Sequence, residues 1–127
     1  MRTLLLCLAA CAALVLTACD DDPIFLRESN MTFVLEDQCS DGYGLQARLF
    51  DLSNDLVWPS NSTVYVVGAG GDIDANIRCR TGALICYGAT TEPETSFFWG
   101  VGIDGFASCD DCCEPCDDVV VRYSLSC

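Results

Sequence analysis

The 127-residue sequence contains no histidine and no lysine. Histidine is the usual general base near neutral pH and the commonest metal ligand. Lysine is needed for Schiff-base chemistry and often binds phosphate groups. Carboxylates, hydroxyls, arginines and thiols are the side chains left to carry any catalysis. We therefore expect a protein that is not an enzyme and that holds no cofactor.

Positive charge in general is scarce. Six arginines oppose nineteen acidic residues, all of which lie from Asp20 onward. Without its first 18 residues the chain has five arginines and a formal charge of −14. Nucleic acid is excluded as a partner, because a protein binds a phosphate backbone by neutralising it with cationic side chains.

One long apolar run is present, at residues 4–16, directly after a charged start at Arg2. The run is shorter than a bilayer-spanning helix and has the length of the apolar core of a secretory signal. The segment Leu16-Thr17-Ala18-Cys19 closes it and resembles the lipobox of bacterial lipoproteins. This resemblance implies cleavage before Cys19, attachment to a membrane through lipid on Cys19, and a location in the bacterial cell envelope, on its periplasmic face or at the cell surface.

The chain is accordingly divided into three parts. Residues 1–18 are predicted to be a cleaved signal peptide, and residues 19–30 an acidic tether that includes Asp20-Asp21-Asp22. Residues 31–127 remain for the folded part, and this length suits one small domain rather than two.

Apolar residues alternate with polar ones through residues 31–127, and no window has helical periodicity. In the clearest segment Ile73, Ala75, Ile77 and Cys79 share one face, which predicts a strand with one buried and one wet side. The predicted strands are residues 31–36, 44–51, 63–67, 73–79, 83–88, 96–103 and 119–127.

Seven short strands separated by turn residues predict an all-β fold, a small disulfide-rich β-sandwich. In the sixth predicted strand Phe97, Trp99, Val101 and Ile103 share one face. We expect this strand and the last one to carry most of the core.

Several of these segments together match the pattern of a known family. Residues 45–51, 63–67, 96–101 and 119–123, with the Thr81-Gly82 turn between them, resemble a bacterial immunoglobulin-like domain of the invasin and intimin type. Leu56-Val57 stands where that family has a Pro-Val step. The resemblance implies an immunoglobulin-like sandwich that acts as a structural or adhesive surface module, and it brings no catalytic residues. The sequence does not identify a partner, for which a protein and a glycan are both candidates.

Cysteine is abundant. Three of the eleven cysteines lie in the signal or at its cut, and the even number that remains permits four disulfides: Cys39, Cys79, Cys86, Cys109, Cys112, Cys113, Cys116 and Cys127. Adjacent Cys112 and Cys113 point in different directions, so we expect separate partners for them, with Cys39 and Cys127 as candidates. Cys79 and Cys86 flank the Thr81-Gly82 turn and are candidates for a hairpin bridge.

Residues 109–118 contain two fused Cys-x-x-Cys units, which allow two other interpretations. Four thiolates at this spacing could hold zinc. Cys113-Glu114-Pro115-Cys116 has the form of a thioredoxin-like redox site, but the neighbouring carboxylates should raise the thiol pKa values and no helix is predicted to start there. We favour a loop pinned by disulfides, because an exported chain meets an oxidising environment.

Two binding sites remain as alternatives. Asp72, Asp74 and Asn76 place oxygen ligands at alternate positions, as at the start of a calcium loop, although Ile77 stands where such a loop needs glycine. We favour the wet face of a strand for these three residues and therefore expect no metal. A sugar-stacking platform is the second alternative, and its candidate aromatic residues are Tyr43, Trp58, Tyr65, Tyr87 and Trp99.

Overall fold

The computed structural model describes residues 27–127, so the predicted signal peptide, Cys19 and most of the predicted tether lie outside the described residues. Within this range the structure has no helix long and apolar enough to cross a membrane. The described chain forms nine strands: β1 (Glu28–Asp37), β2 (Gly44–Asp51), β3 (Leu56–Trp58), β4 (Tyr65–Val67), β5 (Asp72–Arg80), β6 (Leu84–Glu92), β7 (Phe98–Gly100), β8 (Cys113–Pro115) and β9 (Val120–Leu125).

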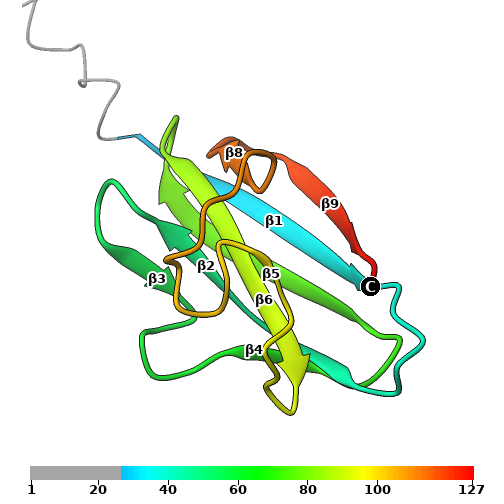
Figure 1. Cartoon of the computed structure of the whole chain (residues 1–127). Helices are drawn as coiled ribbons and strands as arrows, with labels where there is room; N and C mark the ends of the chain where they lie inside the picture. The colour runs from blue at the N-terminus through cyan, green and yellow to red at the C-terminus, as the bar shows by residue number, and fades with distance from the viewer. Residues whose placement is uncertain (1–26) are drawn as a thin grey trace, which may run out of the picture.

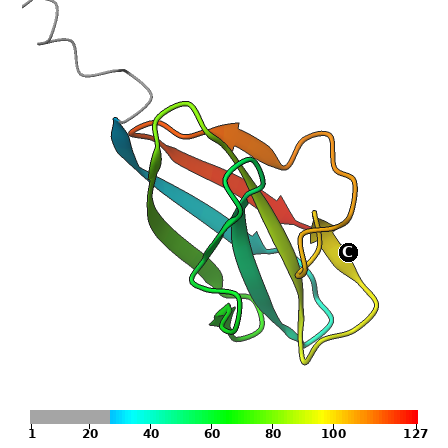
Figure 2. The same cartoon turned by 90° about the vertical axis from the view of Figure 1, so that its left-hand side faces the viewer.

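The strands form two sheets that pack face to face. A three-stranded sheet has the order β5-β1-β9, and a six-stranded sheet follows the path β3-β2-β6-β7, with β4 paired to β2 and β8 paired to β6. Figures 1 and 2 show the two layers from directions 90° apart. The prediction of an all-β, disulfide-rich sandwich is confirmed.

Strand β1 occupies the middle of the three-stranded sheet. It pairs antiparallel with β5 and parallel with β9, so Phe33 lies opposite Ala75 on one side and Val121 on the other. Figure 1 shows β1 and β9 running side by side in the same direction. The start of β1 and the end of β9 therefore lie at opposite ends of the domain. Because β1 begins at Glu28, residues 28–30 belong to the sheet and not to the predicted tether.

The alternation predicted for residues 73–80 is confirmed in β5. Ile73, Ala75, Ile77 and Cys79 are each at most 4% exposed, and the residues between them are exposed. They pack with the inward side chains of β1, β2 and β6, among which the largest fully buried ones are Met31, Phe33, Leu35, Leu45, Leu49 and Ile85. Most of the core thus comes from β1, β2, β5 and β6.

The strand predicted at residues 96–103 does not form over its full length. Only Phe98–Gly100 is a strand there, and Phe97 is 45% exposed whereas Val101 is buried. Gly100 and Gly102 have φ angles of 62° and 73°, a left-handed conformation that interrupts an extended chain. The expected common face of residues 97–103 therefore does not form, and this segment does not carry the core. The last predicted strand does not carry it either, because Leu125 is the one buried residue of β9.

Strand β6 is buried on both faces. Its seven central residues are all buried, although one face of a sandwich sheet should be open to solvent. The loop that follows β7 crosses the outer face of β6: the Val101 N–H donates to the Tyr87 carbonyl oxygen at 3.0 Å, and Gly105 lies against the ring of Phe50. This crossing loop, residues 101–112, is the yellow-orange to orange coil that leads to β8 in Figure 1.

Two short strands were not predicted. Strand β3 adds an edge to β2, and β8 forms inside the cysteine-rich acidic segment by pairing with the start of β6. Each has only three residues, which is too short for a period-two pattern to be visible in the sequence.

Candidate functional site

The cysteines of the folded part are fully paired. Four disulfides join Cys39 to Cys127, Cys79 to Cys116, Cys86 to Cys113 and Cys109 to Cys112. Cys112 and Cys113 have separate partners, as expected from their adjacency. The suggested partners were wrong, because Cys39 and Cys127 bond to each other and neither reaches the acidic loop.

The suggested bridge between Cys79 and Cys86 was also wrong, and the sheet topology gives the reason. Cys79 lies in β5 of the three-stranded sheet, whereas Cys86 lies in β6 of the other sheet. The turn between them passes from one sheet to the other and does not close a hairpin. Cys86 instead lies directly opposite Cys113 in the β6–β8 pair, with the two Cα atoms 3.9 Å apart.

These pairings determine the chemistry open to the Cys113-Glu114-Pro115-Cys116 segment. Cys113 and Cys116 are bonded to different partners, and Cys113 begins a strand rather than a helix. A thioredoxin-like site has its two motif cysteines bonded to each other and one of them at a helix N-terminus. Neither feature is present here, and sulfurs in disulfides are not the thiolates that a zinc site requires.

The proposed calcium ligands Asp72, Asp74 and Asn76 lie along the exposed face of β5. They are opposite Glu36, Val34 and Thr32 of β1 in the strand register. An extended strand separates successive residues of one face by about 7 Å, so their oxygens do not converge on one point. Their alternation is that of the wet face of a strand.

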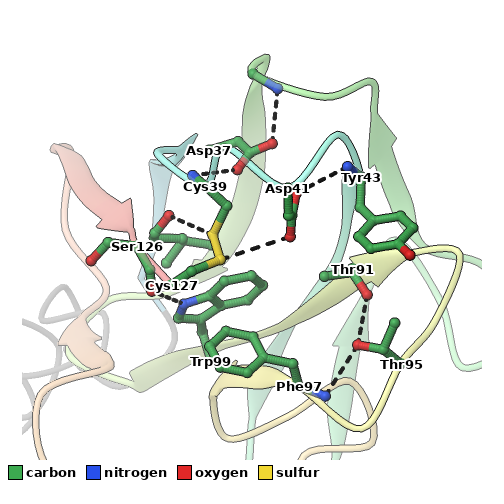
Figure 3. Close-up of a disulfide and its surroundings, with 12 residues drawn as sticks. Asp37, Cys39, Asp41, Tyr43, Thr91, Thr95, Phe97, Trp99, Ser126 and Cys127 are labelled. Atoms are coloured by element: carbon green, nitrogen blue, oxygen red, sulfur yellow. Dashed lines mark hydrogen bonds between the residues drawn. A yellow bond between two sulfur atoms is a disulfide. The ribbon is translucent and has the colours of Figure 1, made fainter.

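Among the described residues, the metal-ligand atoms of Cys39, Asp41 and Cys127 converge within 4.8 Å of one another. Figure 3 shows Asp41 beside the Cys39–Cys127 disulfide, with its Oδ2 atom 3.7 Å from the Cys127 sulfur. Both sulfurs belong to the disulfide, so the group offers one carboxylate. Asp37 fixes this end of the domain by accepting hydrogen bonds from the N–H groups of Cys39 and Gly70, at 3.0 and 2.8 Å.

Aromatic side chains pack beside the same disulfide (Figure 3). The Trp99 indole Nε1–H donates to the Ser126 carbonyl oxygen at 3.0 Å, and the Phe97 ring meets Trp99 edge-on at 4.9 Å between centroids. Trp99 therefore ties the chain after β9 to β7 and is half-buried against the core.

The other candidates for a sugar platform are not gathered in one place. Tyr87 is buried, with its ring centroid 4.5 Å from that of Tyr123, and burial raises the pKa of its hydroxyl. Trp58 and Tyr65 pack against the core from β3 and β4, and burial likewise raises the pKa of Tyr65. Four of the five candidates thus pack against the core, and Tyr43, at 45% exposed, is the one exposed ring among them.

A different aromatic residue is the most exposed large apolar side chain of the described structure. Phe106, in the crossing loop, is 93% exposed. Two hollows, of about 230 and 280 Å³, lie beside it, and Phe106 and Asp104 line both. We call this region the Phe106 surface; besides Phe106 it comprises the exposed residues Leu52, Asp55, Leu56, Glu94, Phe98 and Asp104.

The crossing loop is held in place around Phe106. The Ala107 N–H donates to the Val101 carbonyl oxygen at 2.9 Å and the Gly105 N–H to that of Gly102 at 3.1 Å. Arg48 reaches the loop from β2, donating from Nη1 to the Ile103 carbonyl oxygen at 3.2 Å. The exposure of Phe106 is therefore a property of an ordered loop.

The neighbouring loops are ordered in the same way. The Thr91 hydroxyl donates to the Pro93 carbonyl oxygen at 2.9 Å and shares a second hydrogen bond with the Thr95 hydroxyl at 2.8 Å (Figure 3), which fixes the turn that carries Glu94. On the other side, the buried carboxylate of Asp51 accepts hydrogen bonds from the backbone N–H groups of Ser53 and Asn54, both at 3.1 Å. This turn carries Leu52 and Asp55.

Charge on the Phe106 surface is negative. Glu94 and Asp104 line one hollow, and Asp55 and Asp104 line the other. Arg48 is the one cation among the lining residues; it lies 3.9 Å from Asp104 and also donates from Nε to the Thr63 carbonyl oxygen at 3.0 Å. The rim thus presents exposed carboxylates around an apolar centre.

The sequence pattern does not predict this surface. Phe106 follows Asp104-Gly105, belongs to no alternating segment and so carries no periodic signal. Its signal is the presence of a large aromatic residue inside a stretch otherwise made of turn and loop residues.

The chain matches no family model, no curated protein sequence and no solved structure.

Proposed function

We propose that this protein is a lipid-anchored, non-enzymatic interaction module of the bacterial cell envelope. The charged start, the apolar run and the lipobox ending at Cys19 support the location. Four disulfides in about one hundred residues support an oxidising compartment, since such bonds persist outside the cytosol. The two-sheet architecture agrees with the resemblance to immunoglobulin-like domains of the invasin and intimin type.

The observation that carries the interaction role is the exposure of Phe106 on an ordered loop. Burying a phenylalanine side chain contributes roughly 1.5 to 3 kcal/mol, so an exposed one at a fixed position forgoes that stabilisation. Leu52, Leu56 and Phe98 around it are also about half exposed. Clustered apolar residues with a polar rim are typical of surfaces that bind another macromolecule.

Photo-crosslinking from position 106 tests the interaction role. The full chain with Phe106→p-benzoylphenylalanine, expressed in a bacterial host and irradiated in intact cells, should yield covalent adducts with an envelope protein. The control has the same replacement at Val120, which is 61% exposed on β9 and lines neither hollow. Adducts of equal yield at both positions, or at neither, would contradict the proposal.

Fatty-acid labelling tests the anchor. Cells fed an alkyne fatty acid should incorporate the label into the wild-type chain, and Cys19→Ser should abolish both the label and the recovery of the protein with membranes. A wild-type chain without label, recovered in the soluble fraction, would show that residues 1–18 are an ordinary secretory signal.

A further inference from the structure

Resting on the proposed function, we infer that the Phe106 surface binds a protein segment in which lysine or arginine stands next to an apolar side chain. Three properties of the surface point to this partner: the charge of the rim, the size of the hollows and the hydrogen bonds already made by the lining side chains.

The carboxylates of the rim favour a positively charged partner. Asp104 is 72% exposed and stands between the two hollows, with Glu94 on one side and Asp55 on the other. Arg48 offsets only part of this charge: it lies 3.9 Å from Asp104, but its side chain is only 17% exposed, and Glu94 and Asp55 have no cationic partner among the lining residues. A partner carboxylate is repelled at such a surface, while a cationic side chain is attracted to it.

The apolar centre of the surface favours a cation that is carried on an apolar side-chain stem. Lysine and arginine carry long apolar stems that can lie on apolar surface while the charged head stays at the rim. A cation over the open face of an aromatic ring such as Phe106 gains about 0.5 to 1 kcal/mol at an exposed site. Hollows of about 230 and 280 Å³ are smaller than the usual pocket for a free small ligand, and they suit single side chains of a larger partner.

Two other occupants fit less well. A second copy of the chain brings the same carboxylates and a formal charge of −14, so like charges would face each other. Glycan recognition relies on protein donors as well as acceptors, and here several lining donors are engaged within the chain: the Thr90 hydroxyl donates to the Phe97 carbonyl oxygen at 2.8 Å, and Arg48 donates to two backbone carbonyls.

The test uses isotope-labelled, oxidised protein from residue 19 onward, with Cys19→Ser so that no lipid is attached. The probe is the peptide acetyl-Leu-Arg-Phe-Arg-Leu-amide, followed by NMR. We expect saturable shifts of the amide signals of residues 103–107 and of Asp55 and Glu94. Affinity should fall about fivefold or more when salt is raised from about 20 mM to about 500 mM, because exposed charges are screened.

Matched probes and variants separate charge from apolar contact. A peptide with glutamate in place of arginine, and one with serine in place of leucine and phenylalanine, should give no saturable shifts at the same concentration. Phe106→Ser and Asp104→Asn should each weaken binding of the first peptide about fivefold or more. Val120→Ser and Asp110→Asn, which change exposed residues outside the surface, should leave it unchanged.

The outcomes separate this inference from the proposed function. The inference of a basic partner is overturned if the arginine and glutamate peptides bind equally or if the arginine peptide does not bind saturably. Shifts confined to another face of the domain also overturn it. Saturable shifts with maltotriose at this surface, without peptide binding, would assign a glycan instead. Crosslinks from position 106 to a segment without lysine or arginine would also overturn the inference while leaving the interaction module intact.

Discussion

Gly88 and Gly102 contact each other through their backbones, at the place where the crossing loop lies on β6. A Cβ atom added at Gly88 would stand 1.8 Å from the Gly102 carbonyl oxygen and 3.0 Å from the Phe50 ring. No side chain fits between the strand and the loop, so the absence of one at position 88 lets the loop that carries Phe106 lie flat on the sheet.

Gly88→Ala should therefore destabilise the domain by at least about 2 kcal/mol, as overpacking against backbone does. Urea denaturation of the oxidised protein measures the loss. Gly68→Ala is the matched control, because a Cβ there meets nothing within 4 Å; it should change stability by less than about 0.5 kcal/mol. If both variants lose the same stability, the crossing loop does not pack on β6 as described.

Asp51 supports the turn that carries Leu52 and Asp55. Its carboxylate is 1% exposed and also accepts a hydrogen bond from the Asn54 side-chain amide at 2.7 Å. Asp51→Ala leaves these donors without an acceptor and should cost about 1 to 3 kcal/mol, measured by thermal or urea unfolding. Asp110→Ala, which removes an exposed carboxylate, should be nearly neutral; an Asp51→Ala variant as stable as this control would refute the role of the carboxylate.

The four disulfides should contribute unequally. The Cys39–Cys127 bond closes a span of 88 residues and Cys109–Cys112 a span of 3. On the loop-entropy account these bonds stabilise the fold by about 4 to 5 and about 1 to 2 kcal/mol, respectively. Replacing each pair by alanines and comparing the free energies of unfolding measures the difference, and a non-reducing digest verifies the pairings. Equal losses would show that loop length does not govern these bonds.

Stability should fall in alkaline solution because of Tyr123. Burial raises the pKa of its hydroxyl, and so does the hydrogen bond that it donates to Glu114 at 3.1 Å. The unfolded chain releases this proton at an ordinary pKa of about 10, while the folded chain retains it to higher pH. The stabilisation is therefore complete below about pH 10 and is lost as the pH rises further.

Urea denaturation at about pH 8 and about pH 10.5 measures this loss, since the two values bracket the ordinary tyrosine pKa. Tyr123→Phe should reduce the drop between the two pH values without abolishing it, because burial also raises the pKa of Tyr65 and Tyr87. A drop unchanged in Tyr123→Phe would mean that other groups cause it.

Strands could be predicted where the alternation of apolar and polar residues along the sequence reflects which side chains are buried. Residues 73–80 alternate because one face of β5 packs on the core, and this alternation is visible without knowledge of the partner strands. The separation of Cys112 and Cys113 into different disulfides also followed from local geometry. The failure at residues 97–103 has a local cause too, because Gly100 and Gly102 take positive φ angles that side-chain alternation does not reveal.

Other features depend on contacts between distant segments, which no local pattern contains. Cys79 bonds to Cys116 because β5 and the segment after β8 meet across the two sheets. Burial of both faces of β6 arises from a loop that lies beyond β7 in the sequence. Phe106 lies on that loop and is 93% exposed, and composition alone does not distinguish such a residue from a core phenylalanine.

The disulfide between Cys39, just after β1, and Cys127 has a mechanical consequence. Tension applied between Glu28 and Cys127 runs along the ten residues of β1 and then through the Cys39–Cys127 bond. Residues 40–126 lie outside this covalent path, so pulling cannot unravel them in sequence. A domain tethered at its amino-terminal end could bear load along a single strand while the loops that display Phe106 keep their shape.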